Sequence, residues 1–220
     1  MKVMVISPHP DDETLGAGGT LLKLKSEGHQ IYWLNITNMK PEYGYKPERI
    51  AERNAEIQKV KEAYGFDGFY NLELEPAGVD KIDLGKFIPM LKEVFEEVKP
   101  ELLLLPYQHD VHSDHRVIFE AAYSCTKSFR APYLKTVLAM EILSETDQAM
   151  QESGFVPNVF VDVTDYIDKK IEIMNTYESE ITAPPFPRNA EAIKGLAAYR
   201  GATAYYNYAE AFYLIKSRLD

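Results

Sequence analysis

The stretch that decides the fold is Lys2-Val3-Met4-Val5-Ile6-Ser7-Pro8-His9-Pro10-Asp11-Asp12-Glu13, at the start of the chain. Its first half is a short apolar run, which is typical of a strand buried on both faces of a sheet. Its second half is polar and contains two prolines, so the strand is expected to end there. From Thr14 to Glu27 leucines recur at near-helical spacing. The chain is therefore expected to open with a strand, a polar turn and a helix.

Strands and helices alternate along the rest of the chain. Further strands are predicted at 31–36, 69–74, 102–105, 136–142 and 159–163, and further helices at 47–64, 84–98, 117–127, 166–180 and 190–199. This alternation predicts an α/β fold with a Rossmann-like, doubly wound and mostly parallel sheet flanked by helices, followed by a C-terminal elaboration. No repeat or flexible linker divides the 220 residues, so we expect one domain over residues 1–220.

Charge and composition exclude several classes of partner. The chain has 34 acidic and 24 basic residues and a net charge of −10, whereas nucleic-acid binding needs clustered Lys and Arg. A neutral or cationic small substrate fits better. The longest apolar run, 102–105, is far shorter than the roughly 18 residues that span a membrane, so no membrane span is expected. The single cysteine, Cys125, allows no internal disulfide, which favours a cytoplasmic location.

Two polar loops follow predicted strands of the sheet. The first strand delivers the segment 7–13, and the strand at 102–105 delivers the segment 107–115 after Pro106. Together these loops hold four of the five histidines. Open α/β sheets bind ligands at the carboxyl ends of their strands, where the strand order reverses. We therefore expect the two loops to meet at a functional site.

The residue types in these loops suit a metal. Catalytic zinc usually takes three protein ligands from histidine and carboxylate side chains and leaves one position for a water molecule. His9, Asp12 and His115 supply such a set. We expect one zinc ion per chain, although two histidines and one carboxylate also suit other divalent metals. Asp11 lies beside a ligand and stays free, so it is the candidate general base.

The segment His112-Ser113-Asp114-His115 adds two further candidates. His112 and His115 are three residues apart at a predicted helix start, so their rings can share one face. If protonated, His112 would stabilise the oxyanion of a tetrahedral intermediate and then give a proton to a leaving amine. Asp114 is expected to hydrogen-bond one of these rings and fix its tautomer.

These motifs resemble the PIG-L/LmbE-like family of zinc N-acetylglucosamine deacetylases, whose marks are a His-Pro-Asp-Asp-Glu segment and a later His-x-x-His. The resemblance continues in Arg53-x-x-Glu56 followed by Tyr64-Gly65, and in Tyr208-Ala209-Glu210-Ala211-Phe212, so it spans nearly the whole chain. Where the family usually has Leu-Gly, this chain has Tyr64-Gly65.

The resemblance implies removal of the acetyl group from a small N-acetylated sugar or sugar conjugate. It implies these roles: metal ligands His9, Asp12 and His115, general base Asp11, a polarising or acid role for His112 supported by Asp114, and substrate contact by Arg53. The group attached to the sugar stays open, because only variable loops such as 38–46 would distinguish one conjugate from another.

Other interpretations remain open. Asp11 to Thr14 could serve only as a cap of the following helix. Gly16-Ala17-Gly18-Gly19 hints at a dinucleotide-binding loop, but the third glycine of that fingerprint would fall on Leu21, so we expect these glycines to allow close helix packing. The same fold could also hydrolyse another N-acyl amide, or bind a sugar or nucleotide without catalysis.

The remaining polar and aromatic residues are expected to have structural roles or are assigned no role. Glu13 is expected to support its neighbours rather than to react, and His109 is assigned no role. The Tyr-rich segment 199–213 is expected to pack in the core or at an interface rather than to stack on a sugar. Its aromatic excess is compatible with a homo-oligomer.

Overall fold

A computed structural model describes residues 1–219 of the chain. The strands are β1 (Lys2–Ser7), β2 (Gln30–Thr37), β3 (Gly68–Leu74), β4 (Leu102–Leu105), β5 (Thr136–Met140), β6 (Val159–Asp162) and β7 (Ala209–Ser217). The helices are α1 (Asp12–Ser26), α2 (Pro47–Tyr64), α3 (Leu84–Val98), α4 (Ser113–Ser124), α5 (Ile167–Met174) and α6 (Ala190–Ala204). Short 3-10 helices lie at Pro41–Tyr43, Val79–Lys81, Thr146–Gln148 and Gln151–Ser153.

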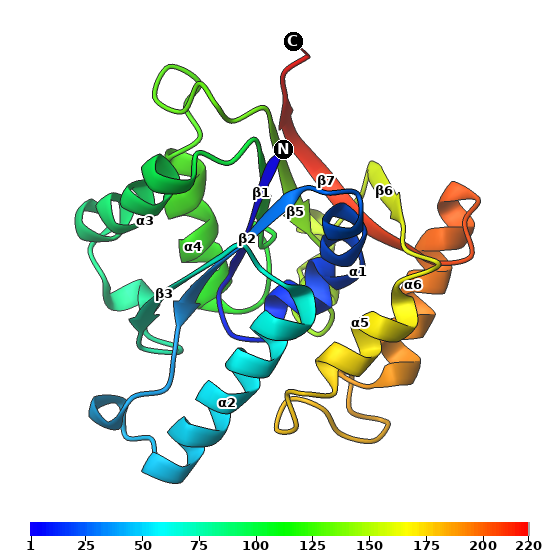
Figure 1. The fold of residues 1–220 in the computed structure, drawn as a ribbon, viewed down its shortest axis with the longest axis horizontal. Helices are drawn as coiled ribbons and strands as arrows, with labels where there is room; N and C mark the ends of the chain where they lie inside the picture. Colours follow the sequence, from blue (N-terminus) through cyan, green and yellow to red (C-terminus); the bar gives the residue numbers. More distant parts are fainter. Residues whose placement is uncertain (220) are drawn as a thin grey trace.

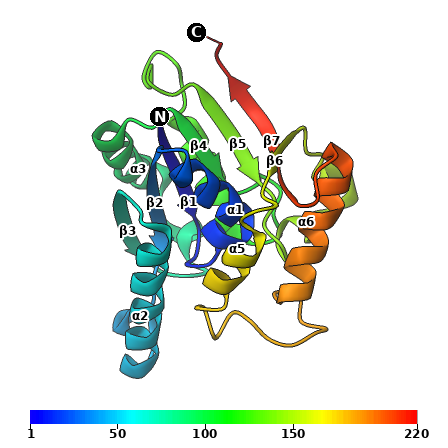
Figure 2. The same ribbon diagram turned by 45° about the vertical axis from the view of Figure 1, so that its right-hand side comes forward.

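The described strands form one seven-stranded sheet in the order β3-β2-β1-β4-β5-β7-β6. Strands β1 to β5 are mutually parallel, whereas β7 runs antiparallel to both β5 and β6. Figure 2 shows β7 lying beside β5 at this end of the sheet. The predicted α/β, doubly wound and mostly parallel fold is confirmed, and its C-terminal elaboration is the antiparallel pair β6 and β7 with helices α5 and α6.

Alternate residues of the central strands face opposite sides of the sheet, as the pleat of a strand requires. Val3 and Val5 pack in the cluster that includes residues of α1, α2, α5 and α6, whereas Met4 and Ile6 pack with residues of α3 and α4. Figure 1 shows α3 and α4 on one side of the sheet and α1, α5 and α6 on the other. The apolar run of β1 is therefore buried on both faces.

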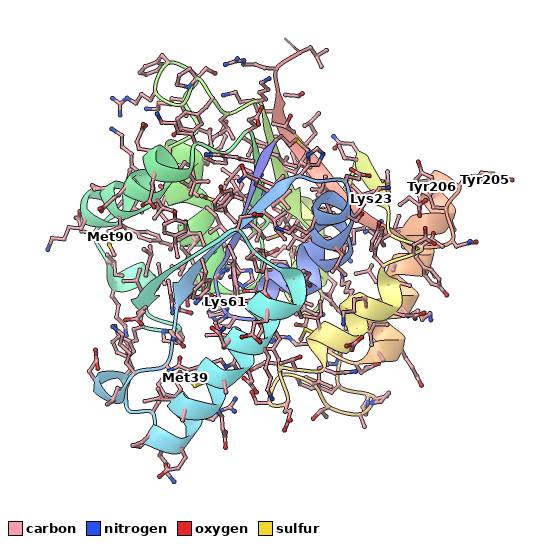
Figure 3. All side chains as sticks on the ribbon, in the orientation of Figure 1. Lys23, Met39, Lys61, Met90, Tyr205 and Tyr206 are labelled. Carbon is pink, nitrogen blue, oxygen red and sulfur yellow. The ribbon has the colours of Figure 1, made fainter. Side chains whose placement is uncertain are left out.

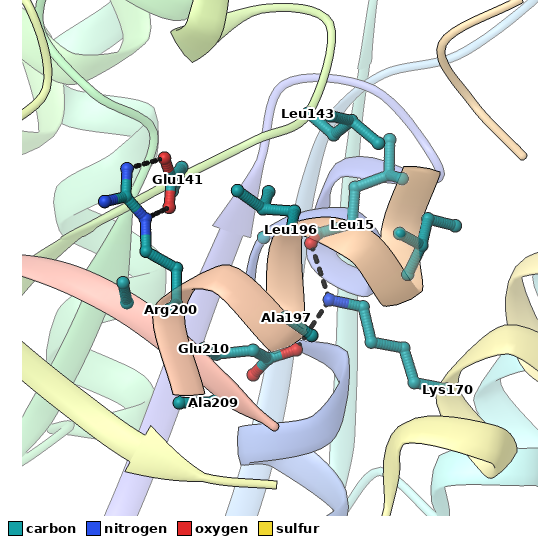
Figure 4. A pocket seen from close by; sticks show the side chains of 12 residues that line it. Leu15, Glu141, Leu143, Lys170, Leu196, Ala197, Arg200, Ala209 and Glu210 are labelled. Atoms are coloured by element: carbon teal, nitrogen blue, oxygen red, sulfur yellow. Dashed lines mark hydrogen bonds and ion pairs between the residues drawn. The ribbon is translucent and has the colours of Figure 1, made fainter. Parts of the chain in front are cut away.

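A buried ion pair between Lys170 and Glu210 holds α1 against the C-terminal elaboration. Lys170 of α5 donates from Nζ to Glu210 Oε1 of β7 at 2.7 Å and to the carbonyl of Leu15 at 2.8 Å (Figure 4). The Glu210 carboxylate also accepts the backbone N–H groups of Gly19 and Thr20, at 2.8 and 2.7 Å. A buried charge is tolerated when it is paired and hydrogen-bonded, as here. The helix that begins at Asp12 is thus held by residues distant in sequence.

The glycines of α1 permit close packing, as expected. A Cβ atom at Gly16 would lie 2.9 Å from the Cβ of Met140, and one at Gly19 would lie 2.7 Å from the Cβ of Val163. Both glycines are inside a helix rather than in a phosphate-binding loop. The packing interpretation is confirmed.

The expectation of core packing is wrong for part of the Tyr-rich segment. Tyr205 is 99% exposed and Tyr206 is 44% exposed, and both project from the end of α6 (Figure 3). Tyr205 has a φ of 64°, which ends α6 in the left-handed region. Tyr208, in contrast, packs against the core. A role of the exposed rings at an interface stays a prediction.

No helix within residues 1–219 combines the length and the apolar character that crossing a membrane requires.

The packing of α1 generates a stability prediction with a matched control. We expect Gly19→Ala to lower the free energy of unfolding by about 1–3 kcal/mol, because the new methyl group overpacks against Val163. Gly195→Ala, in the exposed part of α6 with open space around its Cβ, should raise that free energy by about 0.5–1 kcal/mol. Urea denaturation measures both; equal effects of the two changes would contradict the packing assigned to Gly19.

Candidate active site

The loops that follow β1 and β4 meet where the strand order reverses, as expected. His9 Nε2 lies 3.0 Å from Asp114 Oδ2 across the two loops. The ring of His9 is 4.6 Å from the ring of His112 and 5.5 Å from that of His115, measured between centroids. Residues more than a hundred positions apart in sequence therefore form one polar cluster.

Within this cluster His9, Asp12 and His115 converge. One ligand atom from each lies within 4.8 Å of the others. Asp12 Oδ2 is 3.4 Å from His9 Nδ1 and 3.2 Å from His115 Nε2. Asp12 Oδ1 and His115 Nε2 are buried without a hydrogen-bond partner, and leaving buried polar atoms unsatisfied is costly. Two imidazoles and one carboxylate with orphaned donor atoms fit a divalent metal such as zinc.

The outward-facing nitrogen of each histidine in this set contacts a carboxylate. His9 Nε2 pairs with Asp114 Oδ2 at 3.0 Å, and His115 Nδ1 pairs with Asp110 Oδ2 at 2.8 Å. A carboxylate behind a histidine is the usual means of orienting a metal ligand. Asp114 was expected to bond one of the rings of His112 and His115; that expectation is wrong, because its side chain turns toward the backbone N–H groups of Ala77 and Val79 and the ring of His9.

Asp110 was missed by the sequence analysis. Its carboxylate is fully buried and also accepts the Thr146 hydroxyl at 2.7 Å. The available signal was its position in the same polar loop, five residues before His115. A second group, His9 with His112 and Asp114, is also close enough to hold a metal. The carboxylate of that group already accepts two backbone N–H groups, so the set with Asp12 offers the freer donor atoms.

Neighbouring carboxylates raise the pKa of both converging imidazoles. Burial alone would lower the pKa of His9, but its contacts with Asp114 and Asp12 outweigh burial and raise that pKa to about 9. Burial is likewise outweighed at His115, where Asp12 and Asp110 raise the pKa to about 10. A bound divalent cation would replace these protons, since metal ligation requires neutral imidazole.

Asp11 is buried beside the cluster but belongs to no ligand group. It is 2% exposed, and its φ of 137° is strained for a residue other than glycine. It occupies the N-cap position of α1, yet its side chain makes no cap hydrogen bond. Its carboxylate instead accepts Nη1 of Arg188 at 2.8 Å. The geometry therefore disfavours the helix-cap interpretation. Burial raises the pKa of Asp11 well above its ordinary value, and Arg188 opposes that rise.

Glu13 supports this loop through hydrogen bonds of its carboxylate, as expected. Its carboxylate accepts the backbone N–H of Asp11 at 3.1 Å, the hydroxyl of Thr14 at 2.7 Å and that of Tyr177 at 2.8 Å. Burial raises the pKa of Glu13 to about 7. Its three contacts fix the backbone that presents Asp11.

His112 occupies the N-cap position of α4 and faces the cluster. Its Nδ1 accepts the backbone N–H of Asp114 at 3.1 Å, so the neutral ring carries its proton on Nε2. Burial and the neighbouring His9 lower the pKa of His112. The geometry therefore favours a neutral hydrogen-bond donor rather than the protonated form considered above.

A cleft with a volume of about 250 Å³ opens over these residues. The loop at 38–46, expected near a site, contributes Asn38, Met39 and Tyr45 to its wall. The other lining residues are His9, Pro10, Asp11, Thr37, Arg53, Pro76, Ala77, His112, Glu145, Glu180 and Arg188. His109 is exposed and packs edge-on against Tyr107, outside this wall.

Two arginines of the cleft are held by protein groups. Arg53 of α2 donates from Nη1 to the carbonyl of Pro10 at 2.8 Å and pairs with Glu180 through Nη2. Arg188, which precedes α6, contacts Asp11, Glu145 and Glu180. Nothing in the local sequence pattern pointed to Arg188, Glu145 or Glu180, because they reach the cleft from irregular segments.

Comparison with known proteins agrees with this geometry. The chain is 25% identical to "Diacetylchitobiose deacetylase" of Thermococcus kodakarensis over 228 residues, covering 95% of this chain and 81% of the relative. It is 25% identical to "Probable N-acetyl-alpha-D-glucosaminyl L-malate deacetylase 2" of Bacillus cereus over 194 residues, covering 82% and 84%.

Solved structures share the fold. A conserved protein from Thermus thermophilus superposes with a TM-score of 0.77 and 27% identity, covering 99% of this chain and 96% of that one. GalB, the 4-carboxy-2-hydroxymuconate hydratase of Pseudomonas putida, superposes with a TM-score of 0.75 and 18% identity, covering 100% and 98%, which shows the fold alone. The PIG-L family, described as GlcNAc-PI de-N-acetylase, matches residues 4–126. This match covers more than half of the chain and confirms the resemblance found in its motifs: the chain belongs to the PIG-L family of LmbE-like deacetylases.

Proposed function

We propose that this protein is a zinc-dependent hydrolase that removes the acetyl group from an N-acetylglucosamine-type sugar or sugar conjugate. The observation that carries the proposal is the pairing of two features in one cleft. His9, Asp12 and His115 converge, with orphaned donor atoms on Asp12 and His115, and Asp11 lies beside them as a buried carboxylate outside the ligand set. Two relatives named as deacetylases of N-acetylated sugars support the substrate class.

Each residue of the cleft then has a chemical role. When bound by His9, Asp12 and His115, zinc supplies a Lewis acid that lowers the pKa of water to about 7 and polarises a carbonyl oxygen. Asp11 takes the proton of the attacking water on its carboxylate, because it lies beside the ligand set without belonging to it. Arg188 and Glu13 hold Asp11 and its backbone in place.

His112 stabilises the charge that develops on the amide oxygen. Its neutral ring donates a hydrogen bond from Nε2, because Nδ1 already accepts the backbone N–H of Asp114. The protonated carboxyl group of Asp11 then returns its proton to the sugar nitrogen as the C–N bond breaks. The products are acetate and a free amino sugar.

Arg53 is proposed to contact the sugar from the wall of the cleft. Its Nη1 already donates to Pro10, and a second hydrogen on the same nitrogen can donate to a substrate hydroxyl group. Its established contacts also hold the loop that carries Asp11. Asp114 acts as a positioning residue through His9.

The alternatives are hydrolysis of another N-acyl amide and binding of a sugar or nucleotide without catalysis. A pure binding site has no need of Asp11 outside the ligand set. An acetate-release screen of the zinc-loaded protein over N-acetylated sugars tests the proposal directly. If the zinc-loaded protein released acetate from none of these sugars, the proposal would be contradicted and a different amide substrate would be favoured.

Replacing the base separates catalysis from metal binding. We expect Asp11→Asn to lower kcat by about 10²- to 10⁴-fold, the usual contribution of a general base. Zinc content should stay near one per chain, because the ligand atoms belong to His9, Asp12 and His115. Acetate release and elemental analysis measure the two effects.

The matched control is Asp165→Asn, which makes the same chemical change at an exposed position and should leave kcat unaltered. Unchanged turnover in Asp11→Asn would remove Asp11 from the base role.

Replacing the carboxylate behind His115 tests how the ligand is oriented. We expect Asp110→Asn to weaken zinc affinity by about 10- to 100-fold, because an amide orients and polarises the imidazole less strongly than a carboxylate. Competition with a chelating dye measures the affinity. The control Asp80→Asn, at an exposed position, should bind zinc like the original chain; equal affinities in both variants would argue against the metal set.

A further inference from the structure

Outside the proposed metal ligands and His112, the wall of the cleft has three carboxylates and two arginines. Its permanently charged cations are Arg53 and Arg188, and its carboxylates are Asp11, Glu145 and Glu180. Glu56 adds another carboxylate behind the wall, with Oε2 3.1 Å from Arg53 Nε. A substrate therefore meets arginines that are already surrounded by protein carboxylates.

The positive charge of Arg53 is already balanced by ion pairs with Glu56 and Glu180. Its Nη2 contacts Glu180 and also donates to the hydroxyl of Ser179 at 3.1 Å. Its side chain is almost fully buried. An anion entering the cleft would meet the carboxylate of Glu180 beside this guanidinium, because both residues line the cleft and pair with each other.

The guanidinium of Arg188 also pairs with carboxylates of the protein. Nη1 contacts Asp11 Oδ2 at 2.8 Å and Glu180 Oε2 at 3.4 Å, and Nη2 contacts Glu145 Oε1 at 3.1 Å. Nε donates to the hydroxyl of Ser144 at 2.8 Å. Three acidic side chains thus share one guanidinium.

Glu180 is the group that the two arginines have in common. Its side chain is 27% exposed and lines the cleft, so it faces an incoming ligand. Burial would raise its pKa, but Arg53, Ser179 and Arg188 outweigh burial and lower it. The carboxylate is therefore charged at neutral pH.

We propose that Glu180, together with Glu145, neutralises the two arginines of the cleft and makes the site select N-acyl sugars that carry no carboxylate over conjugates that do. This selectivity rests on the proposed function, because it concerns the substrate of the same site. An anionic ligand must displace or approach Glu180, and a like charge placed against the ligand is a general way to reject it. A neutral sugar needs only hydrogen bonds, which Asn38, Tyr45 and the remaining guanidinium hydrogens can supply.

A matched pair of sugars tests the proposal. The methyl glycoside of N-acetylglucosamine is neutral, and its counterpart oxidised at the primary alcohol carries one carboxylate. Dissociation constants of both for the zinc-loaded protein are measured by calorimetry, and acetate release from both is measured separately. The variants are Glu180→Gln and, as control, Glu178→Gln, which removes the same charge from an exposed side chain two residues away.

We expect the original chain to bind the neutral sugar at least fivefold more tightly than the anionic one. Glu180→Gln should shrink that ratio by about fivefold, the upper range for one partly exposed ion pair. Glu178→Gln should preserve the ratio. Thermal melting confirms that each variant is folded.

The proposal would be overturned if the original chain bound the two sugars equally well. It would also be overturned if Glu180→Gln left the ratio of the two dissociation constants unchanged, or if that variant bound neither sugar. Failure of the proposed function looks different. In that case the neutral sugar binds selectively, yet no acetate is released from either compound. Acetate release with no discrimination between the sugars would leave the deacetylase intact and remove the selectivity.

Discussion

The buried carboxylate of Asp12 is the constraint on which the rest of the site depends. A charge taken out of water is strongly destabilising unless partners compensate it. Here the compensation comes from the backbone N–H of His9 and from the rings of His9 and His115. His9 lies in the loop after β1, and His115 lies in the first turn of α4, which follows the adjacent parallel strand β4. Those rings are in turn fixed by Asp114 and Asp110. The polar cluster therefore extends outward from one carboxylate through two imidazoles to two further carboxylates.

The neighbouring carboxylate, Asp11, pairs with an arginine rather than with imidazole rings. Within residues 1–219 no imidazole pairs with it, its backbone is strained, and Arg188, the cation of its ion pair, is shared with two glutamates. Consecutive residues thus differ in both pairing and backbone conformation. This contrast fits the different roles proposed for two side chains of the same amino acid, Asp12 as a metal ligand and Asp11 as the base.

Much of the fold follows from local sequence signals. The bounds predicted for α2 and α3 agree with the structure, because Pro47 begins the first, Gly65 ends it in the left-handed region, and the Asp83 side chain caps the second. The meeting of His9 with His115 was predictable because parallel neighbouring strands end at one edge of the sheet. Arg188 and Glu180 were not predictable, because no periodicity fixes where the irregular segment between α5 and α6 runs. The partner of Asp114 was missed for a related reason: a side chain's neighbours depend on the loop at Ala77, which no motif marks.

The position of β7 links the C-terminal elaboration to the first helix of the fold. This strand lies between β5 and β6 in the sheet and carries the Glu210 that binds the backbone of α1. Without β7 in place, the buried Lys170 has no Glu210 carboxylate to pair with, and Gly19 and Thr20 lose that acceptor for their backbone N–H groups. Gly19 and Glu210 are 191 positions apart in the sequence. The placement of Asp12, at the start of α1, therefore depends on the C-terminal elaboration as well as on β1.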